Sequence, residues 1–584
     1  MRVLFLHPED VPWQGEWVNS RWDLIVDLGF ASSYTYEEWS RRLGARVLSI
    51  HTFSGQTESY RWVNQVLERG RGRLLDRLGL DWWEIVATEH YQDLHMLYLF
   101  YRLRSEIALD EIDLVASRPD VFTRILGQAL GRSVRYFQSG NLSPVRRLAR
   151  TLRSARHFRP SQIAEIAFDK WDPCYGIRRQ VAKHNRAQLK NPVVLLPSAY
   201  SNVTRSTLAY AAQLPKRQFL LATTRRSAGP AHLPANVQET SLAAYALPLD
   251  ASRTEVAELR NAWELLLRTW LPQFDEFRQA AKAGLWEHFP QYFENGMRLR
   301  NAWKNLLESE PVKGVLCGDD LNYYTRLPLI LAHRGDLNAV YCSHGALDGG
   351  FLFKMPFADS FLVKGEMEKD YLLRARAIEP EKIQVGAPGR NISADQGGRR
   401  GGALVFFSQP YEVEGGRADE IYREILPRLC SVANRNGRKV IVKLHPFESP
   451  SARRSLVASI LPKDVRDQVE MVSGVHPEEV MSRAWCGVTV DSSVAVECAL
   501  RGIPFFLCGW LDFGGMGYLQ QFARFKVAQV LGAPDSIKQI PEMVANYKPD
   551  AVAMDRLWYE VDPAQLEQIM FGTREVCSPD PCAC

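Results

Sequence analysis

Three short clusters in the second half of the chain place histidine, serine and acidic residues directly after apolar runs. The first is Lys443-Leu444-His445-Pro446, in which a histidine follows an apolar run and a proline ends the strand. A neutral imidazole in this position donates a hydrogen bond to a phosphate oxygen, and a protonated one adds positive charge. The alternative is a histidine at a strand end that backbone groups satisfy.

The second cluster, Asp491-Ser492-Ser493, ends one apolar run and opens a helical pattern that contains Glu497. Backbone N–H groups and the helix dipole favour an anion at the start of a helix. Ser492 and Ser493 therefore predict a contact with a phosphate. Glu497 follows four to five residues later, on a helix face that can meet a ribose hydroxyl. The alternative is that one of the serines only caps the helix.

The third cluster, Cys342-Ser343-His344-Gly345, again follows an apolar run. A histidine at the tip of a strand suits general-base work on an acceptor hydroxyl, and we group Asp348 with His344 as a catalytic candidate. Gly349 and Gly350 follow, and glycine allows a ligand to approach the backbone closely. The alternative is a histidine in a turn that has no catalytic role.

Further candidates lie close to these clusters in the sequence. Ser408 ends the first strand of the third block, in a loop position that commonly abuts a donor phosphate, and Lys443 precedes His445. Asp319, Asp320 and Glu366 are candidates for binding an acceptor. A separate candidate sugar site is formed by residues beyond the first strand, which are Asp10, Trp13 and Trp17.

The elements that must position these residues are predicted by an alternation along the chain. A short apolar run, a turn and an amphipathic segment repeat many times, which is typical of α/β proteins with parallel sheets. The 584 residues predict two to four domains. Because ligands of such sheets bind beyond the carboxyl ends of the strands, the polar residues that follow apolar runs are the ones that matter.

Three blocks can be separated. Residues 1–160 form a Rossmann-like unit with a helical insertion at 56–110, residues 161–392 form a second Rossmann-like domain, and residues 403–584 form a third, after a glycine- and arginine-rich linker. Helices are expected at 251–308, and a final helix at Pro563–Phe571 is expected to pack back across the linker. The strands expected in the first and third blocks are Val3–Leu6, Leu24–Asp27, Arg46–Ile50, Leu114–Ser117, Val134–Phe137, Ala403–Phe407, Lys439–Leu444, Val469–Val472, Gly487–Val490 and Pro504–Leu507.

The composition argues against several classes of protein. With 72 Lys and Arg against 67 Asp and Glu, the net charge of +5 is too small for a typical nucleic-acid-binding protein. The ten cysteines form no CxxC pair, so a zinc site is unsupported. Seven of them, mostly within apolar runs, are expected to be buried thiols of a reducing cytosol. They are Cys174, Cys317, Cys342, Cys430, Cys486, Cys498 and Cys508.

The chain is expected to be cytoplasmic. Its first residues are too short an apolar run for a signal peptide, and no stretch approaches the ~18 apolar residues that span a bilayer. The arginines of Arg146–Arg159 lie on an amphipathic pattern, which predicts peripheral contact with the inner face of an anionic membrane or with an acidic glycolipid. The alternative is a solvated basic helix face.

Taken together, the three clusters resemble the GT-B enzymes that act on nucleotide sugars. Residues 314–389, with Asp319-Asp320 and His344-Gly345, resemble the second half of their acceptor domain. Residues 442–446, with the cluster at 491–493 and Glu497, resemble their donor domain. The resemblance is greatest to bacterial capsule and surface-polysaccharide transferases, which include sialyl- and Kdo-transferases and CDP-glycerol glycerophosphotransferases.

The resemblance implies a GT-B-like fold with an additional N-terminal α/β unit, and a group transfer from a nucleotide-activated donor to a hydroxyl of a surface glycan or glycolipid. His445 with Pro446, Ser492 and Ser493 would hold the phosphate of a CMP- or CDP-linked donor, and His344 would be the base. No metal or cofactor is implied, because side chains and helix dipoles stabilise the leaving diphosphate. A UDP-sugar 2-epimerase-like isomerase and a non-catalytic nucleotide-sugar or glycan-binding scaffold remain as alternatives.

Overall fold

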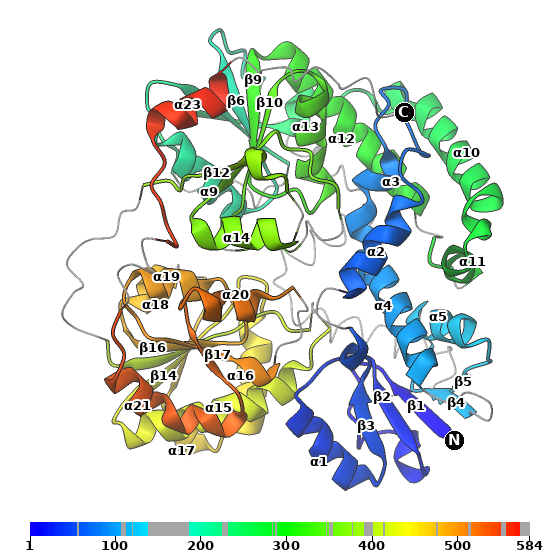
Figure 1. Cartoon of the computed structure of the whole chain (residues 1–584), viewed down its shortest axis with the longest axis vertical. Helices are drawn as coiled ribbons and strands as arrows, with labels where there is room; N and C mark the ends of the chain where they lie inside the picture. The colour runs from blue at the N-terminus through cyan, green and yellow to red at the C-terminus, as the bar shows by residue number, and fades with distance from the viewer. Residues whose placement is uncertain are drawn as a thin grey trace.

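Apolar runs of the sequence form the strands of three parallel sheets, so the predicted α/β fold class is confirmed (Figure 1). The computed structural model describes residues 1–54, 58–106, 113–119, 121–137, 186–224, 232–282, 284–286, 289–345, 347, 349, 354–375, 378–389, 401–412, 415–474, 477–511, 516–549 and 556–572. The predicted basic helix at Arg146–Arg159 lies outside these residues, as do Asp348 and Cys174. Among the described helices, none combines the length and the apolarity that a bilayer-spanning helix needs.

The first sheet has the strand order β3-β2-β1-β4-β5. Its strands are β1 (Arg2–Leu6), β2 (Leu24–Asp27), β3 (Arg46–Ser49), β4 (Asp113–Ala116) and β5 (Arg135–Tyr136), within two residues of the predicted bounds. Helix α1 (Ser33–Leu43) follows β2; the Ser32 hydroxyl caps its start, and Gly44 ends it in the left-handed conformation at φ 64°. The predicted insertion comprises α2 (Glu58–Glu68), α3 (Trp82–Ile85) and α4 (Ala87–Glu106), and α5 (Val121–Leu130) follows β4.

The second sheet has the order β12-β11-β10-β9-β6-β7-β8. Its strands are β6 (Val193–Ser198), β7 (Gln218–Thr223), β8 (Val237–Ser241), β9 (Val312–Cys317), β10 (Asn338–Cys342), β11 (Ser360–Val363) and β12 (Ile383–Val385). Its helices are α9 (Ser201–Ala211), α10 (Arg253–Thr269), α11 (Asp275–Lys282), α12 (Phe289–Ser309), α13 (Tyr323–Arg334) and α14 (Glu366–Ala375). The helices expected at 251–308 are thus confirmed as α10, α11 and α12.

The third sheet has the order β15-β14-β13-β16-β17-β18. Its strands are β13 (Ala403–Phe407), β14 (Lys439–Lys443), β15 (Val469–Val472), β16 (Ala484–Thr489), β17 (Phe505–Cys508) and β18 (Gln529–Leu531). Its helices include α15 (Ala418–Arg435), α16 (Pro450–Ile460), α17 (Lys463–Arg466), α18 (Pro477–Met481), α19 (Val494–Leu500), α20 (Tyr518–Arg524) and α21 (Ile540–Ala545). Strand β16 begins three residues before the predicted start at Gly487, and β18 was not predicted.

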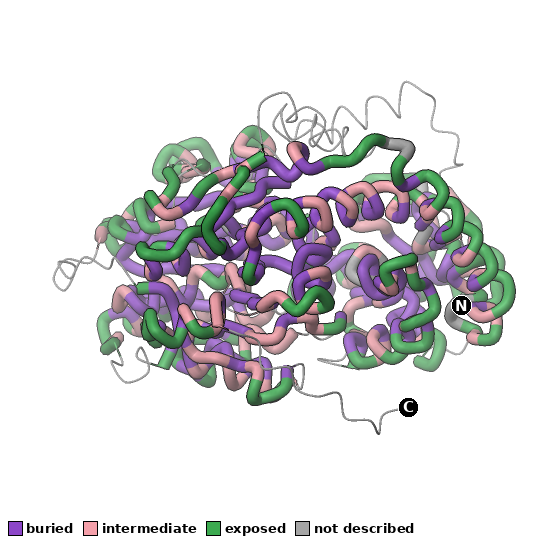
Figure 2. Tube along the Cα trace, turned by 90° about the horizontal axis from the view of Figure 1, so that it is seen from above, coloured by how far each residue is buried: buried purple, intermediate pink, exposed green. Residues whose placement is uncertain are grey.

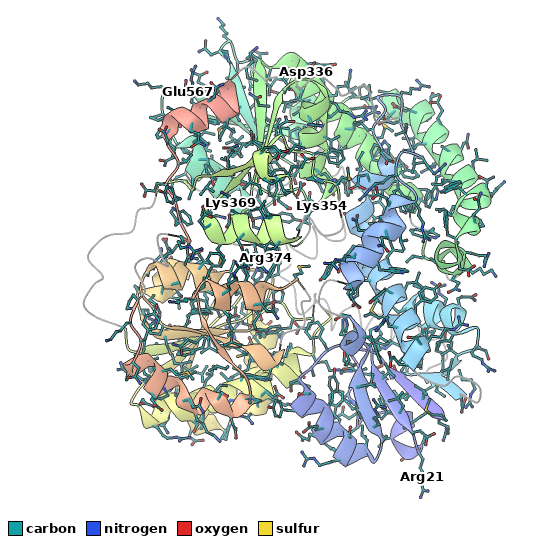
Figure 3. The ribbon with its side chains drawn as sticks, in the orientation of Figure 1. Arg21, Asp336, Lys354, Lys369, Arg374 and Glu567 are labelled. Atoms are coloured by element: carbon teal, nitrogen blue, oxygen red, sulfur yellow. The ribbon has the colours of Figure 1, made fainter. Side chains whose placement is uncertain are left out.

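The last helix, α23 (Pro563–Phe571), leaves the third sheet and packs on β9 and β10 of the second, as the sequence predicts (Figure 1). Asn338 donates from its amide to the carbonyl oxygens of Met570 and Gly572, at 3.3 and 2.8 Å. Glu567, labelled in Figure 3, forms an ion pair with Arg217. The second and third sheets are therefore tied together by the end of the chain.

The core consists of the strands and of the helix faces that cover them. Strands such as β6 and β13 are buried along their whole length, because helices cover both faces of a parallel sheet. Figure 2 shows the buried residues inside and the exposed residues on the outer turns. The six described cysteines of the seven expected to be buried thiols are indeed buried. Trp263, Trp286 and Trp303 are buried as well.

The insertion of the first unit packs against the second. Glu84 of α3 accepts hydrogen bonds from Arg326 at 2.6 Å, from Arg71 at 2.8 Å and from the backbone N–H of Met355 at 2.7 Å. Glu84 and Arg326 are both buried, so their ion pair is shielded from solvent. An aromatic cluster also joins the two units, formed by residues of α3, α10 and α12 and their flanks, which are Trp82, Trp83, Trp263, Trp286, Phe289 and Phe293.

The first unit also docks on the third sheet, through a buried ion pair. The Arg417 guanidinium donates to both carboxylate oxygens of Asp27, at 2.6 and 2.7 Å, and to the carbonyl oxygens of Asp10 and His7, at 2.7 and 3.0 Å. Phe30 joins the two backbones, since its carbonyl accepts from the Arg417 N–H at 2.9 Å. These bonds fix the loops that follow β1 and β2 against the loop that follows β13.

Replacing Arg417 with methionine tests this junction. The Asp27 carboxylate would remain buried without its cationic partner, which typically costs about 3–5 kcal/mol. We expect a lower melting temperature in scanning fluorimetry and faster limited proteolysis of the variant. Arg483→Met is the matched control, because the Arg483–Glu470 pair is 47% and 43% exposed and an exposed pair contributes at most about 1 kcal/mol. Equal losses of stability in the two variants would contradict the assignment.

Candidate functional site

The carboxyl ends of the strands in the second and third sheets face each other. Tyr200, which follows β6, has its ring 6.4 Å from that of Phe447, which follows β14. The Gly349 N–H donates to the Tyr518 hydroxyl at 2.6 Å, which joins the loop after β10 to the start of α20. Arg374 of α14, labelled in Figure 3, donates to Gln521 of α20 between the two domains. The clusters predicted from the sequence therefore lie on two edges that oppose one another.

His445 lies at the end of β14, as predicted, with its ring half-buried. The ring Nδ1 accepts a hydrogen bond from the Phe447 backbone N–H at 3.2 Å, and the backbone N–H of His445 donates to Glu448 at 2.7 Å. Burial, together with the charge of Lys443, lowers the pKa of His445 to about 4. The imidazole is therefore neutral near pH 7, and because Nδ1 is an acceptor, Nε2 carries the proton.

The loop after β16 holds the second cluster. Gln409 and Asp491 exchange two hydrogen bonds, of 2.6 and 3.3 Å, which connect the ends of β13 and β16. The Ser492 hydroxyl accepts from the Val494 N–H at 3.4 Å. Ser493 occupies the cap position of α19, but its side chain makes no capping hydrogen bond and is exposed. Glu497 is half-buried, in the first turn of α19.

Two further predicted donor-binding residues are engaged in internal bonds. The buried Ser408 hydroxyl donates to Glu448 at 2.7 Å and accepts from the Tyr422 hydroxyl at 2.6 Å. The ammonium of Lys443 donates to the Leu444 carbonyl at 2.7 Å, and burial lowers its pKa. Both residues support the loop that presents His445.

His344 lies at the end of β10, half-buried, and its Nδ1 is 3.0 Å from the carbonyl oxygen of Gly318. A carbonyl only accepts, so Nδ1 is the donor of this bond, and the tautomer that it selects has its lone pair at Nε2. Lys364 holds this loop in place by donating to the carbonyls of Ser343 and Gly345, at 2.8 and 2.6 Å. Lys364 is in turn paired with the buried Glu368 at 3.2 Å, a contact that the sequence reasoning did not find.

The three predicted acceptor-binding carboxylates are placed differently. Asp319 is buried, accepts from the Leu321 N–H at 2.9 Å and the Asn322 amide at 2.7 Å, and has its pKa raised by burial. Asp320 is buried in an ion pair with Lys354, which Figure 3 labels. Glu366 begins α14 and is half-buried. The structure brings Asp319 close to His344, whereas Asp320 is occupied by its pairing.

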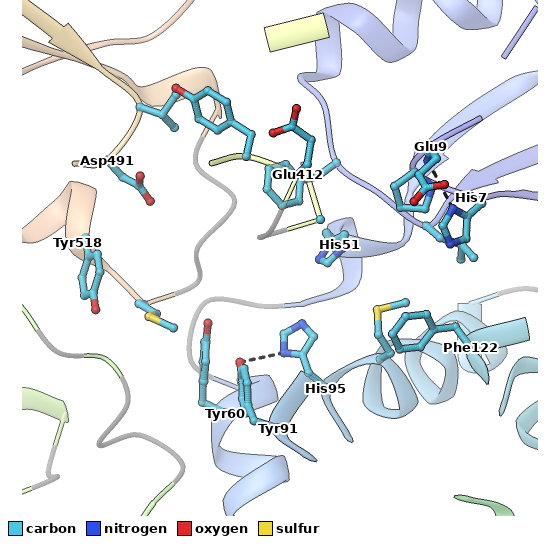
Figure 4. A pocket seen from close by; sticks show the side chains of 18 of the residues that line it. His7, Glu9, His51, Tyr60, Tyr91, His95, Phe122, Glu412, Asp491 and Tyr518 are labelled. Atoms are coloured by element: carbon cyan, nitrogen blue, oxygen red, sulfur yellow. Dashed lines mark hydrogen bonds between the residues drawn. The ribbon is translucent and has the colours of Figure 1, made fainter. Parts of the chain in front are cut away.

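A cavity of about 510 Å³ lies between the carboxyl ends of the first and third sheets (Figure 4). The first unit contributes residues that follow β1, β2 and β3 and residues of α2 and α4; the third contributes residues that follow β13 and β16. Its polar and aromatic lining is formed by His7, Glu9, Phe30, His51, Tyr60, Tyr91, His95, Phe122, Tyr411, Glu412, Asp491 and Tyr518. Of these, Asp491 belongs to a cluster that the sequence analysis selected, and Tyr411 and Glu412 lie in the loop that begins with Ser408.

Burial disfavours the charged forms of His51, His95 and Tyr91 in the cavity. Tyr60 and Tyr91 stack with ring centroids 5.4 Å apart and planes 7° apart, and the Tyr91 hydroxyl is 3.1 Å from His95 Nδ1. Burial lowers the pKa of His51 to about 4 and that of His95 to about 3. Burial also raises the pKa of Tyr91. Near pH 7 the aromatic wall is therefore uncharged.

The three residues predicted as a candidate sugar site beyond the first strand do not line this cavity. Trp17 is buried in the core and Asp10 is paired with Arg118, while the Trp13 ring packs edge-on against Trp39 at 6.0 Å. None of these three lines the cavity, which His7 and Glu9 line instead. His7 directly follows the first predicted strand, so the rule that selected His445 would also have selected it.

The neutrality of His95 makes stability depend on pH. In the unfolded chain a histidine has a pKa near 6.5, whereas in the folded chain the pKa of His95 is about 3. As the pH falls below 6.5, the unfolded state binds a proton that the folded state does not, so the free energy of unfolding falls. The loss is up to about 1.4 kcal/mol per pH unit. In urea denaturation at pH 6.5 and 5, we expect the wild type to lose about 2 kcal/mol more than His95→Gln; parallel losses would contradict a neutral His95.

No family model matches the chain, and no curated protein matches it. A putative UDP-N-acetylglucosamine 2-epimerase from Listeria monocytogenes is similar at 11% identity, over 66% of this chain and 93% of that chain, with a TM-score of 0.38. The UDP-GlcNAc 2-epimerase of Methanocaldococcus jannaschii, solved in complex with UDP-GlcNAc and UDP, is similar at 12% identity over 65% and 98%, with a TM-score of 0.40. The wall teichoic acid polymerase TagF is similar at 10% identity over 73% and 96%, with a TM-score of 0.37. At these identities the similarity concerns the α/β fold alone.

Proposed function

We propose that this chain transfers a group from a nucleotide-activated donor to a hydroxyl of a glycan acceptor, as a glycosyltransferase or a polyol-phosphate transferase. The observation that carries the proposal is the opposite hydrogen bonding of Nδ1 in two imidazoles on facing strand ends. His344 has its free lone pair at Nε2, and His445 has its free N–H at Nε2. One ring is set to take a proton, and the other is set to donate a hydrogen bond.

In the proposed reaction His344 is the base. Its Nε2 takes the proton of the acceptor hydroxyl while the oxygen lone pair forms a bond to the anomeric carbon, or to the phosphorus, of the donor. The bond from that atom to the leaving phosphate oxygen breaks, and its electron pair stays on the oxygen. Lys364 keeps the His344 loop in place, because its ammonium donates to the carbonyls on either side of His344, and Glu368 pairs with that ammonium.

His445 stabilises the leaving phosphate in this proposal. A neutral imidazole donates to an anionic oxygen without the desolvation cost of a buried cation, and a donor fixed in advance is worth most where charge develops. Ser492 and the exposed Ser493 hydroxyl, after β16 and on the far side of β13 from His445, are proposed as further phosphate contacts, and Glu497 as the ribose contact. The resemblance further implies a donor linked to CMP or CDP and an acceptor at the cell surface, and both are part of the proposal.

Nucleotide binding tests the donor edge. We expect one of CMP, CDP, UDP, GDP and ADP to raise the melting temperature of the wild type, and His445→Ala to weaken that binding roughly 10- to 100-fold, the loss of one hydrogen bond to a charged group. His445→Gln keeps an N–H donor and is expected to bind more tightly than His445→Ala. If no nucleotide binds the wild type, the donor site is refuted.

His344→Ala separates chemistry from binding. Since a general base contributes about 10²- to 10⁴-fold, we expect this variant to keep the nucleotide-induced rise in melting temperature and to lose transfer to that extent. The assay measures release of the nucleotide and formation of the glycoside or phosphodiester. Epimerised nucleotide sugar as the product would favour the isomerase instead, and binding without turnover on any acceptor would favour the scaffold.

A further inference from the structure

We propose that the cavity between the first and third sheets binds a neutral sugar ring, and that this ring belongs to the acceptor of the transfer. The stacked pair Tyr60 and Tyr91 would pack against the ring, and the carboxylates of Glu9, Glu412 and Asp491 would accept its hydroxyl protons. The identification of the sugar as the acceptor rests on the proposed function, whereas the sugar site itself rests on the cavity. The acceptor would then be held by the N-terminal unit rather than by Asp319, Asp320 and Glu366.

The aromatic residues supply a flat apolar surface. Tyr60 and Tyr91 lie side by side and nearly parallel (Figure 4), with ring centroids 5.4 Å apart. The rings of His51 and His95 are 6.1 Å apart, with planes 29° apart. Phe30 meets His51 edge-on at 5.5 Å. A pyranose ring has an apolar face of C–H groups and a rim of hydroxyls, so it fits against rigid aromatic faces with polar groups at their edges.

The charges of the cavity favour a neutral ligand rich in donors. Among the lining residues that the structure describes, none is a lysine or an arginine, and three are carboxylates. A phosphate or a nucleotide would face these carboxylates directly, because the arginines that pair with Glu9 and Glu412 do not line the cavity. The hydroxyls of a sugar, in contrast, donate to carboxylates in charge-assisted hydrogen bonds, which are stronger than neutral ones.

Each of the three carboxylates accepts hydrogen bonds from a side chain that does not line the cavity. Glu412 receives two hydrogen bonds from Arg453, at 2.7 and 2.6 Å, and Glu9 receives one from Arg118 at 2.9 Å. Asp491 accepts from the Gln409 amide at 2.6 Å. A carboxylate has about four acceptor positions, so these bonds orient the group and leave positions for a ligand. The side chains of Glu9 and Glu412 are 57% and 54% exposed, which keeps them accessible.

The cavity also supplies donors and adequate room. His7 Nδ1 accepts from the Glu9 N–H at 3.4 Å, so the His7 proton is at Nε2 and can be donated to a sugar oxygen. The volume of about 510 Å³ lies within the ~300–1,000 Å³ of ligand pockets that enclose a small molecule. The two functions that a hydroxyl needs, donor and acceptor, are therefore both present around the aromatic wall.

The position of the cavity connects it to the proposed chemistry. Asp491 lines the cavity and precedes Ser492 of the donor edge, while Tyr518 lines it and is bonded to Gly349, in the loop after β10 that begins with His344. A sugar in the cavity would thus have the donor loop on one side and the loop of the proposed base on the other. The first sheet reaches this position because Arg417 fixes the loops after β1 and β2.

Saturation-transfer NMR on the full chain tests the proposal. The probes are the methyl glycosides of glucose, galactose and N-acetylglucosamine, with choline as a cationic probe. We expect transfer from the protein to at least one glycoside, binding about tenfold weaker in Tyr91→Leu, and about three- to tenfold weaker in Glu9→Gln. Glu9 is exposed, so Glu9→Gln keeps the test valid if Tyr91→Leu does not fold. The matched controls, Tyr34→Leu and Glu38→Gln on the exposed face of α1, are expected to bind as the wild type does.

The outcomes separate this proposal from the proposed function. A retained nucleotide-induced rise in melting temperature with no signal from any glycoside overturns the sugar site and leaves the donor site standing. If the wild type binds a glycoside, the cavity variants weaken that binding and no nucleotide binds, the sugar site is supported, but the sugar is not the acceptor of a transfer reaction. Saturation transfer from the protein to choline, and to none of the glycosides, overturns the proposal, because it identifies an aromatic cage for a cation.

Discussion

The buried ion pair between Arg417 and Asp27 is the interaction on which the arrangement of the three sheets depends. Asp27 ends β2 of the first sheet, and Arg417 lies ten residues beyond β13 of the third, so the pair holds two carboxyl edges against each other. The same guanidinium binds the His7 carbonyl, which places the next residues of that loop at the cavity. A buried pair of this kind adds little net stability, since desolvation offsets the attraction, but losing either partner is costly. Its contribution is to admit one relative position of the two sheets.

A second constraint is the removal of charge from the imidazoles. His51, His95 and His445 lie where burial opposes protonation, so each ring is neutral near pH 7. A neutral ring has one donor and one acceptor, and the partner of Nδ1 decides which function Nε2 performs. The backbone therefore decides the function of each ring. The carbonyl bonded to Nδ1 of His344 makes Nε2 of that ring an acceptor, and the N–H bonded to Nδ1 of His445 makes Nε2 of that ring a donor.

Much of this could be predicted from the sequence, because buried parallel strands are short apolar runs and a polar residue after such a run lies at the edge of a sheet. His344 and His445 were found in this way, and His7 and His51, which also follow predicted strands, could have been. Strands β8 and β18 were missed because they are edge strands with exposed polar residues, such as Gln238 and Gln529. The role of Asp27 could not be predicted, since its partner is 390 residues away. Asp320 resembled a site residue for the same reason: only the fold shows that Lys354 is its partner.

The buried pairs connect the three units into a closed ring, visible in Figure 1. The first unit is bound to the second through Glu84 and Arg326 and to the third through Asp27 and Arg417, while α14 and α23 join the second to the third. Two domains joined at one edge can open by a hinge, because few contacts resist the rotation. In a ring of three, opening any one junction strains the other two, and two of the junctions contain ion pairs that are costly to expose. The fold therefore favours sites that are formed before the ligand arrives, which is where rigid aromatic walls and carboxylates oriented in advance bind best.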